Sequence, residues 1–152
     1  MKKILIASDG SDSAHEALEF GLELAAEQDA EAFILHVARV DAMPYAGFGL
    51  IAPTIPHELS EHDREPLNEA VEIAEEKGVD VKAELLEGNR ADEIVAYADT
   101  IDADVIVVGS RGHGAVASAL IGSVSRRVLH ESRRPVLVVR GTLAEPEALV
   151  PA

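Results

Sequence analysis

The sequence predicts a single doubly wound α/β domain with a five-stranded parallel sheet and four helices. Short apolar runs alternate along the chain with longer stretches in which apolar residues recur every three or four positions, which is the periodicity of an amphipathic helix. Residues 105–108 are wholly apolar and lie between Asp104 and Gly109, as expected for a strand buried on both faces. The length of 152 residues suits one domain, and no tandem repeat or low-complexity tract interrupts the alternation.

Strands and helices are expected to alternate from the first strand to the last. The five expected strands are apolar runs bounded by turn residues, and they cover residues 3–7, 33–38, 80–86, 105–108 and 136–139. The four expected helices are marked by apolar residues on one face: Ala14, Leu18, Leu22 and Ala25 within residues 12–29; Leu67, Ala70, Val71 and Ala74; Ala91, Ile94, Val95, Ala98 and Ile101; and Val124 and Val128. Residues 1–140 are therefore expected to form the domain, and residues 141–152 a C-terminal tail.

The start of the second helix is left open by Pro66. A proline fits best in the first turn of a helix, where its missing N–H has no intrahelical partner to lose. A start farther upstream, with a kink at the proline, is also compatible with the sequence. Gly78 is expected to end this helix, because glycine readily adopts the left-handed conformation that follows a last helical turn.

The composition excludes several classes of protein. With 13 basic and 28 acidic residues, the net charge is −15, which argues against a general affinity for nucleic acid or for an anionic membrane. The absence of cysteine excludes disulfides, thiol catalysis and thiolate metal sites. The sequence contains no run of about 18 apolar residues, the length that a membrane-spanning helix needs. The apolar stretch after Lys2 and Lys3 ends before Asp9, too early for an export signal, so a cytoplasmic protein is expected.

The most informative segment follows the fourth expected strand, where a parallel sheet presents its ligand-binding edge. Gly109, Gly112 and Gly114 would let backbone N–H groups approach a ligand closely, and Gly122 precedes a helix start. Unpaired N–H groups at a helix N-terminus favour a phosphate, and hydroxyls of Ser123 and Ser125 would add donors. Residues 109–140 also hold six arginines and one acidic residue in an acidic protein. These features predict a phosphate-containing ligand, although the arginines could instead pair with surface acids or line a partner interface.

Asp9 follows the first expected strand and is a candidate ligand contact. Its carboxylate could accept from adenine or ribose, or hold Mg²⁺ through water. The alternative is a helix N-cap, but Ser11 and Asp12 are better placed for capping. The spacing of the sequence places no second carboxylate or histidine beside Asp9 as a general acid or base, so no catalytic residue is predicted. His57 and His62 lie among acidic residues, and a solvated acidic loop is a better interpretation of that segment than a metal site.

The glycine pattern is neither a Walker loop nor a dinucleotide fingerprint, since no Gly-Lys-Ser/Thr and no Gly-x-Gly-x-x-Gly occurs there. The pattern Gly109-x2-Gly112-x9-Gly122-Ser123 instead resembles the ATP-binding motif of the universal stress protein family. The resemblance extends over residues 3–140 and includes the segments ILIASDGS at 4–11, LHV at 35–37, ADVIVVGSRG at 103–112 and PVLVVR at 135–140. It implies an adenine-nucleotide-binding domain with strand order 3-2-1-4-5, usually a homodimer.

The resemblance also implies a role for each matching residue. Ala7 and Asp9 match positions that line the adenosine pocket, and Val37 matches the backbone contact to adenine. The residues that match the ribose and phosphate loop are Val108, Gly109, Arg111 and Gly112. Those that match the phosphate-binding start of the fourth helix are Gly122, Ser123, Val124 and Ser125. Arg90 departs from the pattern, because the family often has proline there, and it is expected to lie away from the ligand; His113 is expected to face solvent.

The function that these observations predict is binding of ATP or AMP, with or without Mg²⁺, by a stress-response sensor or signalling protein. A homodimer is expected through the last strand, Val136–Val139, because an apolar edge strand favours pairing with a second copy; a further protein partner stays unidentified. The alternative is a slow ATP hydrolase or nucleotidyl-transfer relative using the same pocket, although the signature His-x-Gly-His of such transferases is absent. A nucleotide-free interaction module and a flavodoxin-like FMN binder are weaker alternatives. The uncharged segment 43–56 is expected to cover the nucleotide as a lid or to pack against a second subunit. The alternative is a loop that packs on the second helix of its own chain.

The net charge of −15, with only four lysines, also suits adaptation to molar salt, the alternative being an ordinary acidic protein. In about 1 M KCl the Debye length falls to about 3 Å, so repulsion between the acidic side chains is screened. We therefore predict that the melting temperature rises by at least about 5 °C between low salt and molar KCl, measured by thermal unfolding. An unchanged or lower melting temperature would contradict the adaptation.

Overall fold

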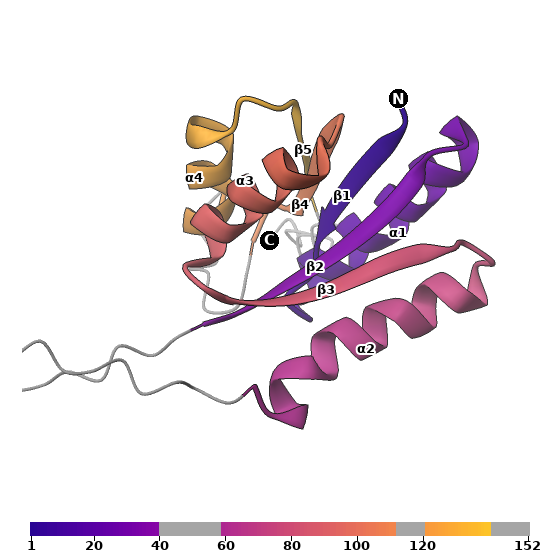
Figure 1. Cartoon of the computed structure of the whole chain (residues 1–152), viewed down its shortest axis with the longest axis horizontal. Coiled ribbons are helices and arrows are strands. Elements are labelled where there is room, and N and C mark those ends of the chain that lie inside the picture. Colours follow the sequence, from indigo (N-terminus) through magenta and orange to yellow (C-terminus); the bar gives the residue numbers. More distant parts are fainter. Residues whose placement is uncertain (40–58, 112–120, 141–152) are drawn as a thin grey trace, which may run out of the picture.

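The computed structural model describes residues 1–39, 59–111 and 121–140, in which helices and strands alternate as the sequence predicts (Figure 1). The strands are β1 (Lys3–Ala7), β2 (Glu31–Arg39), β3 (Val81–Gly88), β4 (Val105–Gly109) and β5 (Val136–Val139). The helices are α1 (Asp12–Gln28), α2 (Glu61–Glu76), α3 (Arg90–Ile101) and α4 (Ser123–Glu131). The predictions for Gly112, His57, His113, segment 43–56 and the tail at 141–152 lie outside the described residues.

All five strands form one parallel sheet in the order β3-β2-β1-β4-β5, which confirms the predicted doubly wound fold and strand order. The central strand β1 pairs with β2 on one side and with β4 on the other, so Ile4 lies opposite both Ala32 and Val105. The direction in which the chain adds strands therefore reverses at β1. In parallel sheets this reversal leaves a crevice at the carboxyl ends of the strands.

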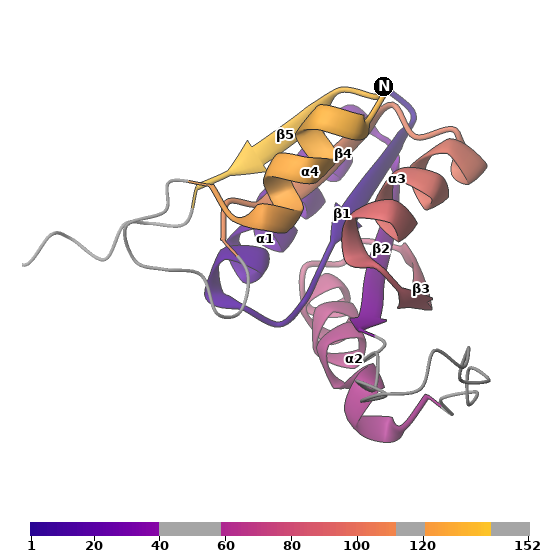
Figure 2. The ribbon, with the colours of Figure 1, turned by 90° about the vertical axis from the view of Figure 1, so that its left-hand side faces the viewer.

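The two faces of the sheet carry two separate apolar cores, because successive strand residues point to opposite sides. Ile4 and Ile6 of β1 pack with α1 and α2, whereas Leu5 packs with α3 and α4. Figure 2 shows the same arrangement from another side, with α3 and α4 on one face of the sheet and α1 and α2 on the other. Residues 105–108 of β4 are all buried, which confirms the prediction of a strand covered on both faces.

Helix α2 begins at Glu61, so the preferred start near Pro66 was wrong and the upstream alternative is right. The physical reason is a capping box, in which the Ser60 hydroxyl accepts from the backbone N–H of Asp63 and the Asp63 carboxylate accepts from that of Ser60. The reciprocal bonds begin the helix before the proline and leave Pro66 inside it. Gly78 follows the helix with φ +70°, as the sequence predicts.

The end of β4 lies very close to the start of α1. A β-carbon added to Gly109 would lie 2.5 Å from the Ser13 Oγ atom and 2.7 Å from the backbone carbonyl carbon of Ser13. Because one of these neighbours is backbone, the clash could be relieved only by moving a helix away from a strand. Glycine at this position is therefore a condition for packing α1 against the carboxyl end of β4.

We predict that Gly109→Ala lowers the free energy of unfolding by about 2–4 kcal/mol, because α1 and β4 must separate to admit the methyl group. The measurement is chemical denaturation of the variant and the wild type. Gly78→Ala is the control, since no atom lies within 4 Å of its β-carbon position and only the left-handed backbone is strained; it should cost about 1 kcal/mol. Equal losses in the two variants would contradict the close-packing interpretation.

Candidate functional site

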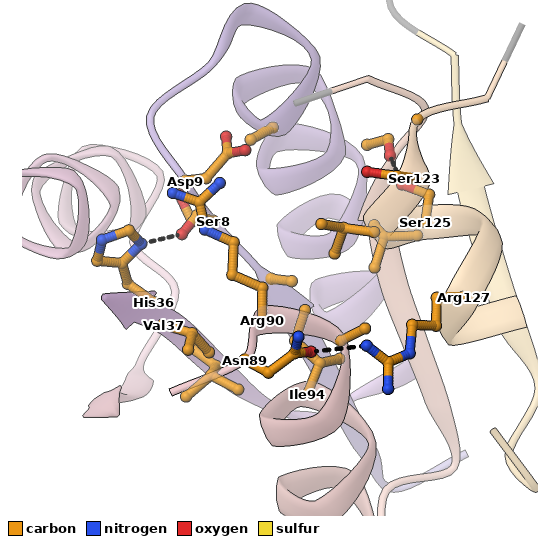
Figure 3. A pocket seen from close by; sticks show the side chains of 18 of the residues that line it. Ser8, Asp9, His36, Val37, Asn89, Arg90, Ile94, Ser123, Ser125 and Arg127 are labelled. Atoms are coloured by element: carbon orange, nitrogen blue, oxygen red, sulfur yellow. Dashed lines mark hydrogen bonds between the residues drawn. The ribbon is translucent and has the colours of Figure 1, made fainter. Parts of the chain in front are cut away.

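A cavity of about 610 Å³ opens at the carboxyl ends of β1, β2 and β4, between the N-termini of α3 and α4 (Figure 3). It lies where the strand order reverses. Ten of the eleven residues singled out from the sequence line it: Ala7, Asp9, Val37, Val108, Gly109, Arg111, Gly122, Ser123, Val124 and Ser125. The eleventh, Gly112, lies outside the described residues. The fold thus brings together segments about 100 residues apart in the chain.

One end of the cavity is the N-terminus of α4. Gly122 precedes the helix, and no side chain of the described residues caps it. The first turn of α4 contains no acidic residue, whereas the first turns of α1, α2 and α3 each contain at least one. Backbone N–H groups of α4 and its dipole therefore face the cavity without a carboxylate beside them, which favours an anion.

Ser123 and Ser125 both line this end, but their hydroxyls differ in what they contact. The Ser125 hydroxyl donates to the backbone carbonyl of Gly109 and so joins α4 to the end of β4. The N–H of Gly122 donates to the Ser110 carbonyl at 2.6 Å, a second link between the same elements. Ser123 is exposed to solvent. Ser123 is consequently the better candidate for donating a hydroxyl hydrogen bond to a ligand, and Ser125 helps to hold the helix N-terminus in place.

The opposite end of the cavity is formed by the ends of β1 and β2. Val37 is buried on β2, and Ile94 of α3 adds a second apolar side chain. The imidazole of His36 donates from Nδ1 to the Ser8 carbonyl at 2.7 Å, since a carbonyl can only accept. Burial lowers the pKa of His36, the bond to Ser8 opposes that shift, and the charge of Arg90 lowers the pKa further.

Asp9 is not the cap of α1. The Ser11 hydroxyl caps the helix by accepting from the N–H of Ala14 at 3.2 Å. One Asp9 carboxylate oxygen accepts from the N–H of Ser11 at 2.9 Å, which orients the side chain at the mouth of the cavity. Asp9 is the one acidic side chain among the described residues that line the cavity.

The arginines of residues 109–140 are divided between the cavity and the surface. Arg127 lines the cavity but forms ion pairs with Asp92 at 2.7 Å and Glu131 at 2.9 Å. Arg134 pairs with Asp99 on α3 and with Asp102 directly after the helix. For these two arginines the alternative of pairing with surface acids holds. Arg111 lines the cavity, as its place in the loop predicts, and its backbone N–H donates to the Ser13 hydroxyl at 3.1 Å.

Arg90 also lines the cavity, so the expectation that it lies away from the ligand site was wrong. The reason is the long pairing of β3 with β2, which continues to Arg39 and Gly88. This pairing carries the loop after β3, and with it the first residue of α3, to the same edge of the sheet. Asn89 lines the cavity as well and was missed from the sequence; its position three residues before Asp92 is an N-cap signal that could have been noticed.

The described residues contain no group of three His, Asp or Glu side chains arranged to hold a metal ion. His62 lies on α2, highly exposed, with Nδ1 at 3.2 Å from a Glu65 carboxylate oxygen. Within those same parts of the chain, no helix is both long and apolar enough to cross a membrane.

A family model described as the universal stress protein family matches residues 1–140. The chain belongs to the universal stress protein family. A universal stress protein of Methanocaldococcus jannaschii is 40% identical over 141 residues, covering 91% of this chain and 82% of that protein. Two solved universal stress proteins have the same fold. One, crystallised in complex with cAMP, is 26% identical with a TM-score of 0.70 over 93% of this chain and 98% of its own. The other, from Archaeoglobus fulgidus in complex with dAMP, is 28% identical with a TM-score of 0.68, and the match covers 91% of this chain and 98% of that protein.

Proposed function

We propose that this universal stress protein binds an adenine nucleotide in the cavity at the carboxyl edge of its sheet. The observation that carries the proposal is the convergence of ten of the residues predicted from the sequence on one cavity with two chemically different ends. The end at β2, where Val37 and Ile94 provide apolar side chains, suits a base, and a helix N-terminus without acidic residues in its first turn suits a phosphate. The related proteins crystallised with cAMP and dAMP support the same ligand class.

In this proposal each end of the cavity supplies the groups that its part of the ligand requires. Val37 and Ile94 give the base an apolar surface, and the Asp9 carboxylate accepts from a ribose hydroxyl or the adenine amino group. The phosphates lie at the start of α4, near Arg111 and the Ser123 hydroxyl. Together these contacts orient the nucleotide across the reversal point of the sheet.

The finer assignment is ATP or AMP, with or without Mg²⁺, bound by a cytoplasmic sensor or signalling protein whose nucleotide occupancy changes the surface offered to a partner. Binding is favoured over slow hydrolysis or nucleotidyl transfer for a physical reason. Asp9 uses one of its oxygens to accept from Ser11, and His36 is buried with its Nδ1 hydrogen given to Ser8. Neither group is thereby arranged to activate water beside a phosphate.

We predict that ATP or AMP raises the melting temperature of the wild type and not that of Gly122→Val. A ligand at about 100 times its Kd adds about 2.7 kcal/mol, or on the order of 5–10 °C for a domain of this size. Gly122 has φ −67° and ψ 161°, a conformation that valine adopts readily, so the variant should fold while its side chain blocks the approach of a phosphate to α4.

The measurement is thermal unfolding in molar KCl with ATP·Mg²⁺, ADP or AMP. The matched control is Ala26→Val on the exposed side of α1, which should keep the shift produced by the nucleotide. No shift in the wild type with any of the three nucleotides would overturn the proposed function. A full shift in Gly122→Val would instead overturn the assignment of the phosphate to α4.

We further propose that two copies pair through β5. Among the described residues β5 pairs only with β4, and its other edge carries partly exposed apolar residues. The carbonyls of Pro135 and Val139 accept from N–H groups of the chain around β4. Because successive residues of a strand point their backbone groups to alternate sides, those of Val138 point outward.

We predict by sedimentation equilibrium a mass of twice 16.1 kDa for the wild type and of 16.1 kDa for Val138→Pro, which lacks the outward N–H. Val138→Thr keeps the N–H and should remain dimeric; a dimeric Val138→Pro would contradict pairing at this edge.

A further inference from the structure

We propose that Arg90 is a base-contacting residue of the cavity, whose guanidinium donates a hydrogen bond to an acceptor nitrogen of the adenine ring. The inference rests on the proposed function, because it assigns a partner within the same bound nucleotide. It adds a cationic donor at the end of the cavity where the sequence analysis predicted only Ala7, Asp9 and Val37.

The position of Arg90 carries the first part of the argument. Arg90 is the first residue of α3 and lines the cavity together with Val37 and Ile94. Figure 3 shows its side chain extending from α3 toward Ser8 and Asp9, on the side of the cavity where His36 lies. Its charge also contributes to lowering the pKa of His36, as expected for a cation close to that ring.

The second part is that Arg90 lacks a partner among the described residues. Its Nε atom is buried and has no hydrogen-bond partner, and the side chain forms no ion pair there. Arg127 and Arg134, by contrast, each contact two carboxylates. A buried donor without a partner is costly. In a chain with 28 acidic residues, a half-buried arginine that lines a cavity with its buried Nε unpaired indicates that a ligand supplies the acceptor.

The third part is that the base, and not the phosphate, lies within reach. Figure 3 places Ser123 and Ser125, at the phosphate end, across the cavity from His36 and Val37, with Arg90 on the His36 side. A guanidinium can only donate, and ring nitrogens of adenine can only accept. The Ser8 hydroxyl, which lines the same end, is a second buried polar group without a partner in the described chain, so this end of the cavity offers more polar atoms than the protein itself pairs.

The test separates the base from the ribose and phosphate. We would measure Kd by isothermal titration calorimetry for AMP, and by displacement of AMP for ribose 5-phosphate, in about 1 M KCl, where the Debye length is about 3 Å. The variants are Arg90→Met, which keeps an unbranched apolar side chain without donors, and Arg90→Pro, which suits the first position of a helix. Arg133→Met is the control, because it removes the same charge from an exposed residue. Arg133 precedes β5, whereas Arg90 follows β3, and these two strands lie at opposite ends of the strand order.

We expect Arg90→Met and Arg90→Pro each to weaken AMP about tenfold, the effect of losing one charged hydrogen bond. Ribose 5-phosphate should change by less than about twofold, and Arg133→Met should change neither ligand. Equal weakening of AMP and ribose 5-phosphate would overturn the base contact in favour of a general charge effect. Unchanged AMP binding in both Arg90 variants would overturn it outright. A wild type that binds no AMP would overturn the proposed function itself, which is a distinct result.

Discussion

The close approach of α1 to the end of β4 is the constraint on which the cavity depends. Gly109 leaves no room for a side chain against Ser13, and the Ser13 hydroxyl then accepts from the N–H of Arg111. On the other side, Ser125 donates to the carbonyl of Gly109. The end of β4 is therefore held between two helices, and this arrangement places the N-terminus of α4 across the cavity from β2.

The electrostatics of the molecule follow from the same arrangement. The chain carries a net charge of −15, yet the described cavity wall holds one carboxylate, that of Asp9, and four arginines, of which Arg127 is paired with Asp92 and Glu131. An acidic surface repels anions at long range, whereas the cationic cavity and the α4 dipole attract them at short range. Salt of molar strength would weaken the repulsion more than the short-range contacts. The distribution of charge thus favours a negatively charged ligand at this one edge.

Much of the fold could be predicted because its signals are local. The bounds predicted for the first and last strands agree with β1 (Lys3–Ala7) and β5 (Val136–Val139), since apolar runs between turn residues define short buried strands. The start of α2 was harder to predict because two local signals competed, a proline and a capping box. The capping box determined the start because it satisfies two backbone groups that the proline does not affect. Arg90 was misplaced because its position depends on the length of the β2–β3 pairing, which involves residues far apart in the chain.

The sequence by itself determined the order of the elements, the doubly wound fold and the residues that follow the carboxyl ends of the strands. These properties depend on periodicity, turn residues and caps, which act over a few positions. Only the tertiary structure decided how each polar group is used: the Ser125 hydroxyl on Gly109, the Arg127 guanidinium on two carboxylates, and Arg90 facing the cavity. The physical reason is that hydrogen bonds and ion pairs require a distance of about 3 Å, and partners such as Arg111 and Ser13 reach it only when the sheet and its helices have assembled.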